Sequence, residues 1–168
     1  RLPLAVDAAS VKVGELQVDA LPALREVQAQ LAVGADGGAR HRVLRLAWRS
    51  DRAVVEAHGE IGTDAPLPVQ LAATAHSVDG AATPWQANLG LQGPLAQLQA
   101  NAHLAGVPSA SPGTPAHPPN AAGAPSLDAT ATLAPFAPWP LAALQLSTRD
   151  LDLNALHAEA PHTRLRGQ

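Results

Sequence analysis

The chain contains no cysteine, methionine or tyrosine, and only three tryptophans and one phenylalanine among its 168 residues. The absence of cysteine excludes a disulfide framework and a thiolate metal site, and it fits both a reducing cytoplasm and a periplasm. Aromatic side chains supply much of the buried area of a globular core, so their scarcity argues against a thick core. The apolar fraction of 46% rests largely on 37 alanines, which bury little area each.

Charged residues are also few, at 15% of the chain, with 11 basic and 14 acidic residues giving a net charge of −3. This balance predicts no binding to nucleic acid. The chain has no signal-peptide pattern and no run of about 18 apolar residues that would span a membrane. Because it opens at Arg1, we interpret it as a segment of a longer protein.

Motifs that carry catalysis or bind cofactors are missing as well. No serine lies in a G-x-S-x-G elbow, and none of the seven histidines lies in an H-E-x-x-H arrangement. The glycines of residues 34–38 lack the lysine and the helix of a phosphate-binding loop, and they predict a hairpin turn. We therefore expect a protein that is not an enzyme and that has no cofactor and no metal site.

Two small clusters of possible metal ligands are assigned to the solvated surface. His157 and His162 flank Glu159, an arrangement that we interpret as loop side chains in water rather than a zinc site. Asp150 and Asp152 lack the further oxygen ligands that a hard cation needs. We interpret them as solvated carboxylates of a strand.

What the sequence does contain is alternation of apolar and polar residues with period two, the pattern of a half-buried strand. In residues 41–49 it places Leu44, Leu46 and Trp48 on one side, with Arg45 and Arg49 on the other. An apparent slip at Gly14 predicts a β-bulge. About ten such strands are separated by turns, and no helical period is long enough for a crossover helix, so the predicted class is all-β, with an antiparallel meander. The alternating segments are residues 11–18, 27–33, 41–49, 67–75, 85–91, 98–104, 127–133, 144–146 and 151–153.

Three segments depart from this pattern. Residues 106–126 hold six prolines and predict a disordered insertion, which can lie between two strands of one sheet without dividing the domain. Residues 153–160 predict a short helical turn that Asp152 caps and Pro161 ends. Residues 135–140, Pro-Phe-Ala-Pro-Trp-Pro, predict a rigid corner where Trp139 caps the end of a strand.

A weak repeat adds an expectation about shape. The sequence Pro-Leu-Ala-Gln-Leu-Gln at residues 94–99 returns as Pro-Leu-Ala-Ala-Leu-Gln at residues 140–145. Repetition on this scale predicts that residues 1–168 form one elongated sheet in which each unit contacts mainly its neighbours.

The apolar face of such a sheet must be covered by a second sheet, a closed barrel, helices or a ligand. The composition disfavours helices and a filled barrel, and leaves two alternatives: a β-sandwich, or a curved sheet whose open apolar groove suits acyl chains. In the second alternative the groove-lining residues are Leu44, Leu46, Trp48, Val69, Leu71, Trp85, Leu89, Leu91, Leu98, Leu104, Leu144 and Leu146.

The only concentrated charge feature is the group of arginines at positions 40, 42, 45, 49 and 52. Such a group attracts lipid headgroups or an acidic partner surface. The alternative, which we favour, is the polar outer face of a strand with guanidinium groups in water.

The tail at residues 144–167 resembles the TamB family of the AsmA-like superfamily. The likeness lies in Asp-Leu-Asp-Leu at residues 150–153, followed by a short turn, Pro161 and the sequence Thr163-x-Leu165-x-Gly167. Residues 93–106 are similar to that family's G-x-L-x-x-L-x-A-x-x-x-L-x-G strand unit. These motifs describe strands and include no catalytic signature.

The resemblance implies a middle segment of a long periplasmic protein that is anchored in the bacterial inner membrane, with a sheet curled into a U-shaped apolar groove. It implies phospholipid transport between the two membranes and a role in assembling outer-membrane or secreted proteins. The implied partners are phospholipid acyl chains and a TamA-like outer-membrane barrel, which would bind parts of the parent chain outside this segment.

The competing hypothesis is a structural or adhesive β module, either a solenoid or a sandwich, that only presents a binding surface. A solenoid requires a regular repeat of roughly 20 to 30 residues, which this sequence lacks.

Overall fold

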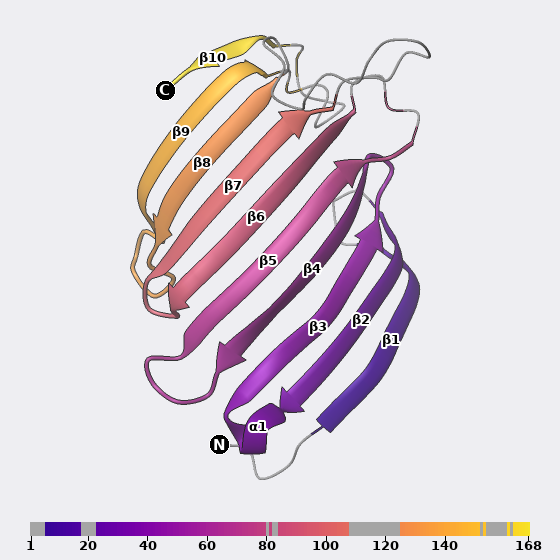
Figure 1. Cartoon of the computed structure of the whole chain (residues 1–168), viewed down its shortest axis with the longest axis vertical. Helices are drawn as coiled ribbons and strands as arrows, with labels where there is room; N and C mark the ends of the chain where they lie inside the picture. The colour runs from indigo at the N-terminus through magenta and orange to yellow at the C-terminus, as the bar shows by residue number, and fades with distance from the viewer. Residues whose placement is uncertain are drawn as a thin grey trace.

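The computed structural model describes residues 6–17, 23–79, 81, 84–107, 125–151, 153, 161 and 163–168 (Figure 1). Ten strands and one short helical turn account for most of them. They are β1 (Val6–Leu16), β2 (Leu24–Gly34), α1 (Ala35–Gly38), β3 (Arg40–Arg49), β4 (Ala53–Gly62), β5 (Pro68–Ser77), β6 (Trp85–Pro94), β7 (Leu98–Gly106), β8 (Ser126–Leu133), β9 (Leu141–Leu151) and β10 (Leu165–Gly167).

The strands form a single antiparallel sheet in the order β1 to β10, and each strand pairs only with the strands that precede and follow it in sequence. This confirms the prediction of an all-β antiparallel meander. The sheet is not closed, and the described residues form one layer with no second sheet over either face.

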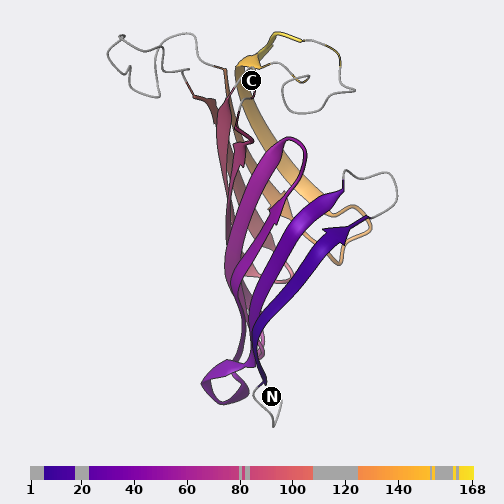
Figure 2. The same ribbon diagram turned by 90° about the vertical axis from the view of Figure 1, so that its right-hand side faces the viewer.

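The sheet is curved as well as twisted. Figure 2 shows β1, β2 and β9 leaning to the same side of the middle strands, so the two edges bend toward each other behind the face seen in Figure 1. This shape is a trough with a concave inner face and a convex outer face, as the curved-sheet alternative predicted.

The pairing register separates apolar from polar side chains, because residues directly opposite each other on neighbouring strands share a face. One face is apolar across the whole sheet, and the opposite face carries the polar side chains. An apolar row from β1 to β9 consists of Val11, Ala29, Leu46, Ala57, Ala73, Leu89, Ala102, Ala129 and Leu146. A polar row on the other face consists of Lys12, Gln28, Ala47, Glu56, Thr74, Asn88, His103, Asp128 and Ser147.

The handedness of the backbone shows that the apolar face is the concave one. In an L-polypeptide strand drawn upward, a residue whose N–H points left has its side chain directed away from the viewer. In Figure 1 strand β3 runs upward with β4 on its left, and the Ser50 N–H donates to the Ala53 carbonyl at 2.8 Å, toward β4. Ser50, and with it Trp48, therefore points to the rear, which is the concave side.

The sheet has almost no interior. The buried apolar residues are four alanines and two leucines, and no side chain is completely buried among the described residues. The accessible surface is 11127 Å², against about 7,800 Å² for a compact monomer of this mass. Ladder hydrogen bonds rather than a core therefore hold these strands together.

The tight connection between β2 and β3 confirms the predicted hairpin turn. Asp36, Gly37 and Gly38 have positive φ angles of 55°, 69° and 86°. Glycine and aspartate tolerate this left-handed region better than most residues, which explains why α1 is a left-handed turn rather than a true helix.

Two local predictions are wrong. Gly14 does not interrupt the register, because Val13 faces Val27 and Glu15 faces Arg25, and the irregularity of β1 lies between Ala8 and Val11. Trp139 does not cap a strand, because its side chain is 74% exposed. A single-layer sheet offers no second layer for the ring to cover.

The proline-rich segment lies between adjacent strands. β7 ends at Gly106 and β8 begins at Ser126, and the Gly106 N–H donates to the Pro125 carbonyl at 2.8 Å. Residues 108–124 lie outside the described residues, as does most of the helical turn predicted for residues 153–160.

Gly59 tests the packing of this sheet. A Cβ atom there would lie 2.5 Å from the Gln70 carbonyl oxygen and 3.0 Å from the Leu71 Cα. We expect Gly59→Ala to lower the free energy of unfolding by about 1–3 kcal/mol, because backbone atoms must move. Urea unfolding measures the effect. Gly14→Ala is the control, since nothing lies within 4 Å of its Cβ position, and equal midpoints for the two variants would contradict this account.

Candidate functional site

The concave apolar face, called the trough below, is the first candidate site. Its residues alternate with outer-face residues along each strand, so the fold places them there by period two alone. A second apolar row, next to the one described above, consists of Leu31, Val43, Gly59, Leu71, Leu91, Ala100, Ala131 and Leu144. The two rows give the trough a continuous apolar floor from β2 to β9.

The structure brings most of the predicted lining residues together on this face. Cross-strand pairs such as Leu71 with Leu91 and Leu104 with Leu127 join them from strand to strand. The predicted residues that share the trough are Leu46, Trp48, Val69, Leu71, Trp85, Leu89, Leu91, Leu98, Leu104, Leu144 and Leu146.

Leu44 is the exception, and the predicted alternation of Leu44 with Leu46 is wrong. Val43 faces Gly59 and Leu46 faces Ala57, so β3 carries one more residue than β4 at this point. The extra residue makes a β-bulge, which moves Leu44 out of the trough and leaves its side chain 56% exposed. Val43 takes the place in the trough that the sequence pattern assigned to Leu44.

One apolar hollow of the trough combines predicted lining residues, Val69 and Leu71, with residues that were not predicted. This hollow, of about 230 Å³, lies over β2 to β5, and its apolar side chains include Leu31, Val33, Ile61 and Val69, with His41 at its border. Each of these residues shows period-two alternation in the sequence. Four strands surround this hollow only because they pair in the observed register. The register cannot be read from the sequence of any single strand.

Three members of the arginine group lie on the outer face of β3 and form ion pairs with nearby carboxylates. Arg40 donates to Glu60 at 2.9 Å, Arg42 pairs with Asp36 and Glu60, and Arg45 pairs with Glu56. All of these side chains are substantially exposed, so each pair contributes little to stability. The arrangement fits the interpretation of a solvated polar face.

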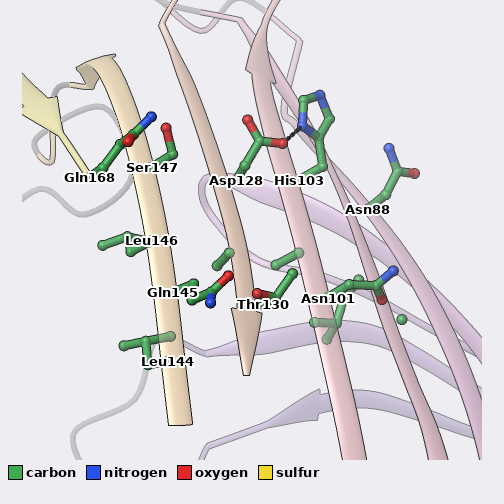
Figure 3. A pocket seen from close by; sticks show the side chains of 14 residues that line it. Asn88, Asn101, His103, Asp128, Thr130, Leu144, Gln145, Leu146, Ser147 and Gln168 are labelled. Atoms are coloured by element: carbon green, nitrogen blue, oxygen red, sulfur yellow. Dashed lines mark hydrogen bonds and ion pairs between the residues drawn. The ribbon is translucent and has the colours of Figure 1, made fainter. Parts of the chain in front are cut away.

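A second hollow, of about 930 Å³, lies over β6 to β9 (Figure 3). Its lining includes polar outer-face residues, such as Asn101, and also residues of the apolar rows, such as Leu89 and Leu146. In Figure 3 Asp128 and His103 point toward each other, with Oδ1 and Nδ1 2.6 Å apart. Among the hydrogen bonds of the described residues, none joins His103 to a hydroxyl group that it would activate. The arrangement offers hydrogen bonds to a ligand but no nucleophile with its base.

Of the candidate metal ligands, only Asp150 lies in the part of the chain that the structure describes. Within the described ranges, no three histidine or acidic side chains lie close enough to share a metal ion. Asp152, His157, Glu159 and His162 lie outside the described residues. The carboxylate of Asp150 forms ion pairs with Arg164 and Arg166.

Asp150 ties β10 to β9. Its Oδ1 accepts hydrogen bonds from the Nε atoms of Arg164 at 2.8 Å and Arg166 at 2.7 Å, and its Oδ2 accepts one from Nη2 of Arg166 at 2.8 Å. These hydrogen bonds from Arg164 and Arg166 hold the pKa of Asp150 below its usual value of 3.8. The backbone of Asp150 has a positive φ of 48°, one residue before β9 ends at Leu151.

Comparisons with protein-family models, with curated proteins and with solved structures gave no match for this chain. In the part of the chain that is described, no helix has the length and apolar character needed to cross a membrane.

The Asp150 cluster predicts a pH dependence at this end of the sheet. Because the pKa of Asp150 is lowered on folding, its contribution to stability is present above the unfolded value and is lost as the pH falls through the folded value. We expect Asp150→Asn to weaken hydrogen-exchange protection of the β10 amides at pH 7, and to match the wild type at strongly acidic pH.

The matched control is Asp51→Asn, which removes an exposed carboxylate that pairs with Arg25 at 3.7 Å, far from β10 in sequence and in sheet order. If the hydrogen-exchange protection of the β10 amides is unchanged in Asp150→Asn at pH 7, the Asp150 cluster does not stabilise this strand.

Proposed function

We propose that this chain is a periplasmic segment of a TamB-like translocation and assembly protein, and that its trough carries phospholipid acyl chains between the inner and outer membranes. The observation that carries the proposal is an apolar concave face that runs across the sheet with no layer over it among the described residues. The motifs of residues 93–106 and 144–167, which resemble that family, supply the biological setting.

The composition of the trough suits a moving acyl chain. Transfer of an acyl chain from water to an apolar wall is favourable, and the chain needs no specific hydrogen-bond partner. Alanine, glycine, valine and leucine make up the two floor rows, so the surface is apolar without being filled by large rings. A lining without strong individual sites lets a chain slide, and transport along it would be passive.

The proposal assigns the remaining functions to the parent protein. Anchoring in the inner membrane, contact with a TamA-like outer-membrane barrel and a role in assembling outer-membrane or secreted proteins would involve parts of the parent chain outside this segment. Phospholipid headgroups would stay at the open side of the trough, in water.

Charge placed in the trough tests this function. We expect the double variant Leu71→Asp/Leu89→Asp, in the full-length protein, to lose phospholipid transport between the membranes. A carboxylate in the trough must lose water when an acyl chain lies against it, at a cost on the order of several kcal/mol or more. The assay follows labelled phospholipid reaching the outer membrane, and circular dichroism of the purified protein checks that the sheet forms.

The matched control is Gln70→Asp/Asn88→Asp, which adds the same two charges at the neighbouring positions on the outer face, opposite Gln92 and Thr74. This control should transport phospholipid normally. Normal transport in a folded Leu71→Asp/Leu89→Asp variant would contradict the proposal and favour a structural or adhesive module.

A further inference from the structure

The turn between β8 and β9 exposes half of the aromatic side chains of this protein. Phe136 and Trp139 are each 74% exposed, whereas Trp48 and Trp85 on the sheet are partly buried. Large apolar side chains at such exposure are costly in water, and together on one turn they mark an interaction surface. The turn, residues 134–140, is called the aromatic tip below.

The aromatic tip is held in one conformation. The Ala134 N–H donates to the Pro140 carbonyl at 2.7 Å, and the Ala137 N–H donates to the Ala134 carbonyl at 2.9 Å. Prolines at positions 135, 138 and 140 fix three φ angles. A tip that is already ordered loses little conformational entropy when its rings leave water.

The surroundings of the aromatic tip are uncharged and apolar. No Asp, Glu, Lys or Arg occurs between Asp128 and Arg149. Leu133 and Leu141, which face each other at the base of the turn, belong to the apolar face, and Leu144 and Leu146 continue it at 55% and 44% exposure. The apolar surface therefore runs from the tip directly into the trough.

We propose that the aromatic tip inserts into the interfacial region of a phospholipid bilayer. Tryptophan favours that region because its ring is apolar while its indole N–H remains available to water and headgroups. The absence of charge argues for a zwitterionic surface, since no lysine or arginine on this stretch would attract anionic lipid. The continuity with the trough would bring the end of the acyl path to the membrane surface.

The aromatic tip can be labelled specifically, because the chain has no cysteine. Ala137→Cys carries an environment-sensitive fluorophore at the exposed centre of the turn, and Asp51→Cys carries the same fluorophore on the β3–β4 turn as a control. With phosphatidylcholine vesicles we expect a blue shift and stronger emission at position 137 only. The response should be the same in low and high salt, because no ion pair contributes.

The variant Phe136→Ser/Trp139→Ser then tests whether the rings cause binding. We expect vesicle co-sedimentation to fall at least about tenfold, since each ring buries roughly 150–250 Å² when it leaves water. Val107→Ser/Leu165→Ser, which removes two other exposed apolar side chains, should bind as the wild type does.

Three results would overturn the proposal: no fluorescence change at position 137, full vesicle binding by the Phe136→Ser/Trp139→Ser variant, or binding that needs anionic lipid. Concentration-dependent self-association that the same variant abolishes, without vesicle binding, would assign the tip to a second copy of the chain. Because this assay measures docking alone, its failure leaves the transport result with Leu71→Asp/Leu89→Asp as a separate test of the trough.

Discussion

One constraint shapes the sheet: an apolar face has to be kept from water, and the described residues provide no second layer to cover it. Burial is worth about 25 cal/mol per Å² of apolar surface, and the protein exposes about 3,300 Å² more than a compact monomer of its mass would. A sheet built this way gains its stability from cross-strand hydrogen bonds and cross-strand side-chain pairs. It also keeps a large surface available for an apolar ligand.

The curvature and the composition of the sheet act together. Because the edges bend toward the apolar side, that face is sheltered while the arginine–carboxylate pairs lie on the convex side in water. Small side chains such as Ala100, Ala102 and Ala129 keep the floor low. Larger aromatic side chains in the same places would fill the trough. The scarcity of aromatic residues, which argues against a thick core, is therefore consistent with an open groove.

Much of the fold could be predicted from the sequence, because period-two alternation is a local property. The strand class, the meander and the faces of residues such as Leu71 and Trp85 follow from it. The Asp36-Gly37 turn follows from residues that tolerate positive φ. Alternation does not determine the register in which neighbouring strands pair. The bulge that displaces Leu44 depends on how β3 pairs with β4, and the hollow beside Ile61 depends on four strands at once. The exposure of Trp139 depends on the absence of a second layer, which only the assembled sheet reveals.

The central claim is that the trough, and not the outer face, contacts acyl chains. The most direct measurement places a photo-crosslinking residue at Leu71 or at its neighbour Gln70 in the full-length protein in cells, followed by mass spectrometry of the adducts. These adjacent positions lie on opposite faces of the same strand, so they differ in little but the direction of the side chain. Our account predicts phospholipid adducts at position 71 and none at position 70. Adducts with protein alone at position 71, or equal lipid adducts at both positions, would contradict it.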